Sequence, residues 1–305
     1  MTPDRSLWRY RIPCRQPLPL PAGPLTVREG LVLVEQDRFG QVRAAAEAAP
    51  LPGFSGETLD EVSAALGQAL ARTGQWPPAS PLPSVQWALR TLRTGAGMIP
   101  ADTDVPVAGF GRHRDSGIIK VKLGPDLQDN RHRISQALAT GARLRLDANR
   151  QLDVRQALTL FSALSPDRVD GVEEPCAGLE ESLRVCQRTG LPLWLDESTR
   201  ECPPDELLRI LAGMGADARA IAAVVLKPML LGDALDAWLE AAGQARWRVI
   251  LSSTYESPVG LAALRHLAAR IAPDDVHGLD TAHLFACTLP WPPEPGLYWR
   301  RLWPQ

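Results

Sequence analysis

Lysine is scarce in this chain of 305 residues. Of 33 lysine and arginine residues, only Lys120, Lys122 and Lys227 are lysine. Arginine stays protonated at any relevant pH, whereas burial or a neighbouring cation can shift a lysine amine toward neutrality and let it act as a base. A codon bias would also leave few lysines, so their positions must decide between the two interpretations.

Paired cysteines and long apolar runs are absent. The five cysteines are odd in number and form no C-x-x-C pair, which argues against a disulfide framework or a zinc site. No apolar run approaches the roughly 18 residues that a membrane span needs. The N-terminus lacks the apolar core and cleavage site of a secretory signal. We therefore expect reduced cysteines and a cytoplasmic protein.

A large excess of one charge is also missing. The formal net charge is −2 and the basic residues are scattered along the chain. The sequence therefore shows no cluster of basic residues of the kind that binds nucleic acid or an anionic membrane. The expected partner is a small molecule, and the sequence leaves the oligomeric state open.

The length permits two domains, a barrel of about 200–250 residues and a smaller second domain. We expect residues 1–104 to form an α+β unit, with a β-hairpin over residues 25–36 and a helix over residues 58–72. The tail, about 285–305, is a candidate to pack back on this unit. Residues 105–284 are expected to form a (β/α) barrel.

Short apolar strands alternate with amphipathic stretches in the barrel segment, which is typical of a parallel sheet covered by helices. Eight strands are predicted, at residues 105–110, 118–122, 143–147, 170–173, 193–196, 222–227, 248–253 and 276–280.

Six of these strands finish on a polar residue after an apolar run. In a (β/α) barrel the carboxyl ends of the strands meet at one mouth, so these residues would surround a single site. The six are Lys122, Asp147, Glu173, Asp196, Lys227 and Ser253.

The three acids predict a metal site. Asp147, Glu173 and Asp196 would repel one another unless a cation held them, and a set of oxygen ligands suits Mg²⁺. Each acid alone could instead cap the helix after its strand, but three on successive strands favour the metal. Because side chains alternate along a strand, only one of Glu173 and Glu174 can face it, and we choose Glu173.

The lysines predict acid–base chemistry. Lys120 and Lys122 are two residues apart on a strand, so both point into the barrel. Their proximity is expected to lower the pKa of one of them, and Lys122, nearer the mouth, is the candidate base. Lys227 arrives from the opposite side, where a cation could stabilise developing negative charge. Structural salt bridges are the alternative.

This ordered set of residues resembles that of the muconate-lactonizing subgroup of the enolase superfamily. The sequence segments around these residues are similar to those of the o-succinylbenzoate synthase family within that subgroup. The resemblance implies an α/β fold, a modified (β/α)8 barrel of the (β/α)7β type with an N-terminal α+β cap. One departure is Ala46-Glu47, where the family usually shows Gly-Glu. The matching segments are PLPGFSGET (50–58), LRLDANR (144–150), EEPC (173–176), LDESTRE (195–201), VVLKPMLLG (224–232) and LSSTYESPVGL (251–261).

The resemblance implies a hydro-lyase, a carbon–oxygen lyase of menaquinone biosynthesis. Its small-molecule carboxylate substrate would be 2-succinyl-6-hydroxy-2,4-cyclohexadiene-1-carboxylate, and its product 2-succinylbenzoate. The family's metal ligands match Asp147, Glu173 and Asp196, which would hold Mg²⁺, with Mn²⁺ as a substitute. Its base matches Lys122, with Lys120 beside it and Lys227 opposite.

Further residues are candidates for substrate binding. Ordinary strand-end hydrogen bonding and turn chemistry explain these residues about as well. The candidates are Arg145, Asn149, Ser252, Ser253 and the turn from Gly278 to Asp280 in the barrel, with Phe54, Ser55 and Arg15 on loops of the first unit.

Two other functions remain open. Relatives with the same lysines racemise N-succinylamino acids, epimerise dipeptides or cycloisomerise muconates, and racemisation needs only lysines on opposite faces of the α-carbon, as Lys122 and Lys227 would be. A non-catalytic barrel that binds a metabolite is the other alternative, and lost site residues would mark it.

Overall fold

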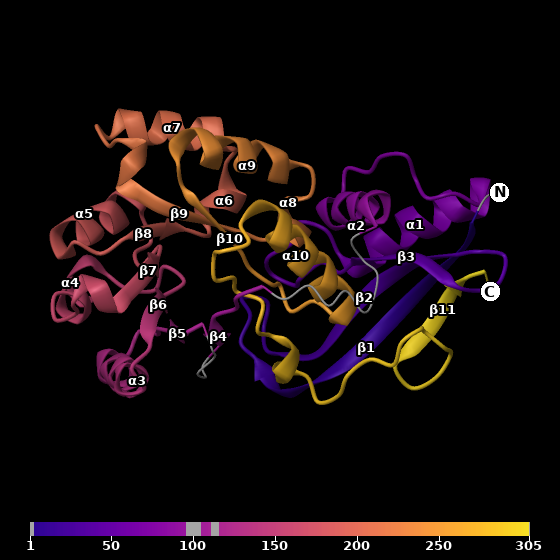
Figure 1. The fold of residues 1–305 in the computed structure, drawn as a ribbon, viewed down its shortest axis with the longest axis horizontal. Helices are drawn as coiled ribbons and strands as arrows, with labels where there is room; N and C mark the ends of the chain where they lie inside the picture. The colour runs from indigo at the N-terminus through magenta and orange to yellow at the C-terminus, as the bar shows by residue number, and fades with distance from the viewer. Residues whose placement is uncertain (1–2, 96–104, 111–115, 305) are drawn as a thin grey trace.

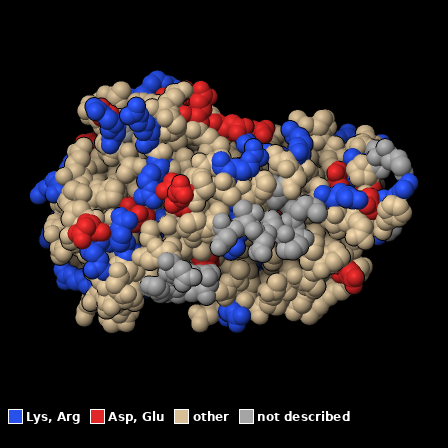
Figure 2. Space-filling view, in the orientation of Figure 1, with Lys and Arg blue, Asp and Glu red and all other residues tan. Residues whose placement is uncertain are grey.

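Two sheets organise the structure, a computed structural model that describes residues 3–95, 105–110 and 116–304. In Figure 1 a small antiparallel sheet lies at one end of the molecule and a parallel sheet surrounded by helices lies at the other. Among the described residues, no helix is both long and apolar enough to cross a membrane. Basic and acidic side chains are interspersed over the face drawn in Figure 2.

The antiparallel sheet combines both ends of the chain. Alternate residues of its strands are buried against helices α1 (Leu59–Thr73) and α2 (Pro83–Thr94), as the period of two along a strand requires. Ala46, where the sequence departs from the family, is fully buried in this core. The strand order is β11 (Trp299–Trp303), β1 (Asp4–Leu18), β2 (Leu25–Gln36) and β3 (Val42–Ala48).

The predicted hairpin over residues 25–36 is wrong, because this segment is the single strand β2. Gly30 lies in mid-strand opposite Tyr10, and a Cβ added there would come within 2.6 Å of the Tyr10 ring. Close approach of an aromatic ring, and not a turn, therefore explains this glycine. The predicted helix over residues 58–72 is confirmed, and Thr58 caps it by accepting a hydrogen bond from the Glu61 N–H.

The parallel sheet closes into a ring. A single parallel bridge joins His277 to Val107 at one edge, and another joins Gly278 to Ser252 at the other. The segment predicted as the eighth strand thus closes the barrel with two residues. The other strands follow the order β10 (Arg248–Leu251), β9 (Ile221–Leu226), β8 (Leu193–Leu195), β7 (Val169–Glu173), β6 (Arg143–Asp147), β5 (Ile118–Lys122) and β4 (Gly109–Phe110).

Helices follow strands β5 to β10 and return the chain to the start of the next strand, so the carboxyl ends of the strands share one mouth. Three single turns of 3-10 helix lie at Pro166–Arg168, Ala218–Ala220 and Ala282–Leu284. The helices are α3 (Leu127–Ala139), α4 (Val154–Phe161), α5 (Leu179–Thr189), α6 (Ser198–Glu201), α7 (Pro204–Gly213), α8 (Pro228–Leu231), α9 (Ala234–Ala245) and α10 (Pro258–Ile271).

The antiparallel sheet with α1 and α2, here called the cap, lies beside the barrel. The boundary expected at residues 104 and 105 falls at a segment, 96–104, that lies outside the described residues. The C-terminal tail returns from the barrel to the cap, where β11 pairs with β1 and Trp299 lies opposite Tyr10.

Candidate active site

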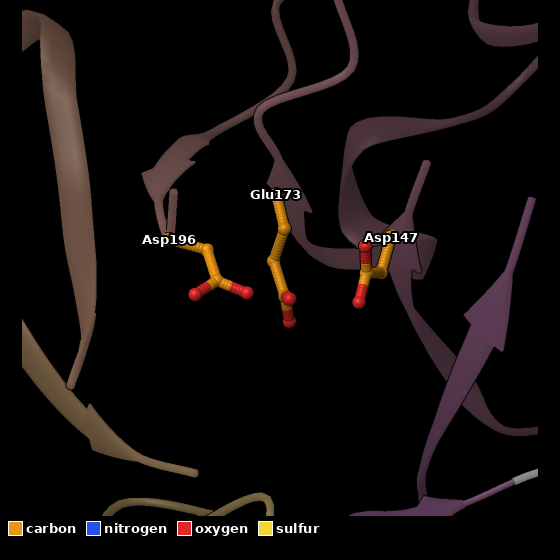
Figure 3. A group of neighbouring side chains, drawn as sticks. All are labelled: Asp147, Glu173 and Asp196. Carbon is orange, nitrogen blue, oxygen red and sulfur yellow. The ribbon is translucent and has the colours of Figure 1, made fainter. Parts of the chain in front are cut away.

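Three buried acids converge at the carboxyl ends of successive strands. Asp147 ends β6, Glu173 ends β7 and Asp196 directly follows β8. Each is 1% exposed, and one carboxylate oxygen of each lies within 4.8 Å of those of the other two. In Figure 3 the three carboxylates point into a common space. Negative charges this close together repel one another unless cations lie among them.

Two lysines reach this cluster from β5, the neighbour of β6. Lys120 Nζ lies 2.6 Å from Glu173 Oε2 and 2.8 Å from Asp147 Oδ2. Lys122 Nζ lies 2.5 Å from the same Asp147 oxygen. Both lysines therefore point into the barrel, as their two-residue spacing predicted.

The third lysine approaches from the other side. Lys227 directly follows β9, the neighbour of β8, and its Nζ lies 2.5 Å from Asp196 Oδ1 and 2.6 Å from Asp196 Oδ2. All three lysines of the chain thus contact the three acids. The three ammonium groups balance the formal charge of the three carboxylates, and lysines lie on both sides of the acids.

Burial and these ion pairs shift the pKa values of the cluster. Burial would lower the pKa of Lys120, but the Asp147 and Glu173 carboxylates outweigh burial and raise it. The proximity of two ammonium groups was expected to lower the pKa of one of the two lysines. It does not lower the pKa of Lys120, because two carboxylates contact this lysine. Burial raises the pKa of Glu173 to about 7, although Lys120 opposes this.

The donor set fits a small divalent cation. Asp147, Glu173 and Asp196 offer only carboxylate oxygen, the ligand that Mg²⁺ prefers, from a rigid sheet in a buried position. Glu174 points elsewhere, because its carboxylate accepts hydrogen bonds from the backbone N–H groups of Asp196 and Ser198 at 2.8 and 2.9 Å. Of the two neighbouring glutamates, Glu173 is the one that belongs to this cluster.

A cavity of about 510 Å³ opens beside the cluster. Loops of the cap contribute apolar side chains to its wall, and the barrel contributes most of the polar ones. The lining residues from the cap are Leu18, Pro19, Leu20, Leu51 and Phe54. The charged lining residues all come from the barrel and are Lys120, Lys122, Arg133, Lys227 and Asp280.

Six of the residues expected to bind substrate line the cavity. Asn149 Oδ1 accepts a hydrogen bond from Lys122 Nζ at 2.8 Å, and its Nδ2 donates to Glu197 at 3.1 Å. Asn149 therefore orients the Lys122 side chain. The six are Phe54, Asn149, Ser252, Ser253, Gly278 and Asp280.

Arg145 does not line the cavity, contrary to expectation. Its guanidinium donates to Asp170 and to the Val276 carbonyl, both at 2.8 Å, and lies over the Trp194 ring. Arg145 and Asp147 are two residues apart on β6, so alternation directs both side chains into the barrel. It does not fix the end of the barrel toward which a long side chain extends.

Two cap residues that were candidates for substrate binding also lie outside the cavity lining. Arg15 Nε donates to the His283 carbonyl at 3.0 Å, and the Ser55 hydroxyl accepts a hydrogen bond from the Leu51 N–H at 2.8 Å. Neither residue lines the cavity. The Ser55 hydroxyl stabilises the turn that carries Phe54, which is the role that turn chemistry alone gives it.

Several lining residues were missed because no motif marks them. Arg133 looks like one of many charged residues on a helix, and Leu20 and Leu230 look like ordinary apolar residues. Tyr255 follows β10, so its place at the mouth was available from the strand pattern. Its backbone has a φ of 63°, which is unusual for a residue other than glycine.

The loop after β10 is organised around the buried Glu256. Its carboxylate accepts hydrogen bonds from the Ser253 hydroxyl at 2.5 Å and from the Thr254 hydroxyl and N–H, both at 2.6 Å. Burial raises the pKa of Glu256, against these hydrogen bonds. Arg28 of the cap, also buried, donates to the Tyr255 carbonyl at 3.0 Å. The cap therefore holds one wall of the cavity in place.

Two protein-family models match the chain. One, described as enolase C-terminal domain-like, matches residues 111–292, and the other, the MenC N-terminal domain, matches residues 3–94. The fold resembles the crystal structure of o-succinylbenzoate synthase from Thermosynechococcus elongatus BP-1, complexed with Mg in its active site. The TM-score is 0.68 and the identity 24%, over 90% of this chain and 92% of that one.

Curated relatives match nearly end to end. The o-succinylbenzoate synthase of Salmonella arizonae is 32% identical over 94% of each chain. That of Yersinia pseudotuberculosis is 31% identical over 97% of this chain and 99% of the relative. Because these relatives match at 31–32% identity over nearly their whole length, the chain belongs to the o-succinylbenzoate synthase family of enolase-like proteins.

Proposed function

We propose that this protein is an Mg²⁺-dependent o-succinylbenzoate synthase. It dehydrates 2-succinyl-6-hydroxy-2,4-cyclohexadiene-1-carboxylate to 2-succinylbenzoate in menaquinone biosynthesis. The observation that carries the proposal is the convergence of Asp147, Glu173 and Asp196 between lysines that approach from both sides. Membership of the family supports the choice of substrate.

Asp147, Glu173 and Asp196 would hold the Mg²⁺, since they offer three buried carboxylates. When bound, this ion would draw electron density from the ring carboxylate of the substrate and so acidify the adjacent C–H. The related enzyme from Thermosynechococcus elongatus is described with Mg in its active site.

Lys122 is the proposed base. Lys122 lines the cavity, and Asn149 orients its Nζ by accepting a hydrogen bond from it. The amine takes the proton from C1 of the substrate, and the C–H electron pair forms the C1–C6 double bond as the C6–O bond breaks. The proton then passes from Nζ to the leaving hydroxide, which departs as water. The ring becomes aromatic, and no oxidant is needed.

Lys120 and Lys227 have supporting roles in this proposal. Lys120 is buried and its raised pKa keeps it an ammonium that compensates Asp147 and Glu173. Lys227 faces the substrate from the side opposite Lys122, where its ammonium stabilises negative charge on the substrate carboxylate. Loops of the cap close the mouth with apolar side chains such as Leu20 and Phe54, which exclude water.

Ultraviolet turnover of freshly prepared cyclohexadiene carboxylate tests the proposal. Product should form with Mg²⁺, and both a chelator and Lys122→Ala should abolish it. Arg131→Ala is a matched control, because Arg131 is a cation on exposed helix α3 that does not line the cavity. Absence of turnover by the unmodified enzyme would refute the named substrate.

Racemisation or epimerisation is the second candidate function, because Lys122 and Lys227 approach from opposite sides. Such an enzyme would deliver a proton to either face of an α-carbon. N-succinylamino acids and dipeptides in deuterated water provide the test, since deuterium should enter the α-position of both enantiomers. Exchange without dehydration of the cyclohexadiene would favour this function over the synthase.

A further inference from the structure

We propose that Arg133 binds the second carboxylate of the substrate, at the end of its succinyl chain, and sets a preference for dicarboxylates. This inference rests on the proposed function and extends it to a residue outside the acid–lysine cluster. Arg133 lies on helix α3, directly after strand β5, and lines the cavity together with Lys122.

The substrate carries two carboxylates, and the cluster is suited to receive one of them. The other lies at the end of a flexible chain and needs its own partner, since burying an unpaired carboxylate is costly. Among the described residues that line the cavity, the cations are Arg133 and the three lysines. The three lysines lie at the acid cluster, where the proposed function uses them for the ring carboxylate and its proton. Arg133 is the cation left for the second carboxylate.

On the other side of the mouth, two of the hydroxyls that line the cavity are already engaged. The hydroxyls of Ser253 and Thr254 already donate to Glu256, which leaves them no proton to offer a ligand. Asp280, in the turn that was a candidate for substrate binding, is an acid that also lines the cavity and is 4% exposed. Ser253, Thr254 and Asp280 therefore add no positive charge to that side of the mouth.

The guanidinium of Arg133 is held near the base but keeps capacity for a ligand. Its Nη1 donates to the Lys122 carbonyl at 3.3 Å, which ties it to the end of the catalytic strand. Its Nη2 lies 2.6 Å from Asp129. Five N–H groups in a planar fork allow a further carboxylate to bind through two hydrogen bonds.

The Asp129 pair does not prevent this. The side chains of Arg133 and Asp129 are 49% and 47% exposed, and such solvent-exposed pairs contribute little to stability. A substrate carboxylate in the cavity can therefore replace Asp129 at low cost. The apolar wall formed by Leu20, Leu51 and Phe54 excludes water, which strengthens the hydrogen bonds between Arg133 and the substrate carboxylate.

Steady-state kinetics on the full chain with Mg²⁺ test the inference. In Arg133→Met, KM should rise roughly 10- to 100-fold, the range expected for a hydrogen bond to a charged group, with little change in kcat. Arg133→Lys should recover part of the affinity, because it restores the charge without the fork. Arg131→Met, on the same helix but outside the cavity lining, should behave as the unmodified enzyme.

A second readout separates recognition from a structural effect. Inhibition by 2-succinylbenzoate is compared with inhibition by its ester at the succinyl carboxylate. The unmodified enzyme should prefer the diacid, and Arg133→Met should lose that preference. Unchanged KM and unchanged preference in Arg133→Met, with turnover by the unmodified enzyme, would overturn this inference alone. No turnover by the unmodified enzyme would overturn the proposed function and this inference with it.

Discussion

The Glu47 carboxylate of cap strand β3 accepts a hydrogen bond from the backbone N–H of Gly260, in the first turn of barrel helix α10, at 2.8 Å. The same carboxylate accepts hydrogen bonds from the Ser257 N–H at 3.1 Å and from the Tyr10 hydroxyl at 2.6 Å. The first N–H groups of a helix have no partner within it and favour a negative charge. One buried side chain thus joins the cap to the barrel.

Glu47→Gln should therefore destabilise the fold. The amide loses the charge and places N–H donors against the N–H groups of Ser257 and Gly260, so we expect the free energy of unfolding to fall by roughly 2–4 kcal/mol. Urea denaturation followed by circular dichroism measures it. Glu206→Gln, on the exposed face of α7, is the control and should change little. Equal stability of both variants would contradict the role given to Glu47.

Lys120 and Lys122 should differ in their effect on stability. The Lys120 side chain is 9% exposed and contacts two buried carboxylates, whereas the Lys122 side chain is 36% exposed. Lys120→Met leaves two buried charges without that ammonium and should cost roughly 3–5 kcal/mol in metal-free buffer. Lys122→Met should cost less while still abolishing turnover. Denaturation of the two variants side by side checks this, and an equal loss would argue against it.

The strand ends that carry Asp147, Glu173 and Asp196 could be predicted because two local rules suffice. Apolar runs end at these positions, and a barrel brings strand ends to one mouth. The reach of Arg145 could not be predicted, since alternation gives a direction across the sheet only. The hairpin over residues 25–36 was predicted wrongly for a related reason, because the ring that excludes a side chain at Gly30 belongs to Tyr10 on the neighbouring strand.

The walls of the cavity were the least predictable part of the site. Leu20 and Phe54 lie beside the barrel mouth only because the cap docks there, and docking depends on contacts such as those of Glu47 and Arg28 that no local pattern encodes. Arg133 faces the cavity from a helix whose other charged residues are solvated. Residues that act through tertiary packing leave no periodic signal in a single sequence.

Removal of the metal should abolish activity and preserve the fold. The carboxylates of the cluster are also compensated by Lys120, Lys122 and Lys227, so the barrel does not depend on a cation alone. With a chelator, circular dichroism should be retained, and stability should fall only by the binding contribution, about 2.7 kcal/mol for ligand at 100 times its Kd. Unfolding on chelation at 25 °C would show that the lysines do not compensate the acids.

Asp170 links stability to pH. It lies 2.8 Å from Arg145 and 3.2 Å from Arg248, near the base of β7. Burial raises the pKa of Asp170, but Arg145 and Arg248 outweigh burial, and the pKa lies below its ordinary value of 3.8. Because the folded pKa is the lower one, the unfolded chain binds the proton more tightly. The stabilisation is therefore complete above pH 3.8 and is lost as the pH falls through the folded pKa.

Asp170→Asn should therefore destabilise the protein at pH 7, by roughly 3–5 kcal/mol, because it leaves the buried Arg145 without its counter-ion. The gap between variant and unmodified protein should narrow as the pH falls below 3.8, where protonation removes the same charge from the unmodified protein. Urea midpoints of both proteins at pH 7 and in this acidic range measure the gap. Asp205→Asn, in an exposed pair with Arg209, should show little difference at either pH. A gap that stays constant would mean that Asp170 acts through packing and not through its charge.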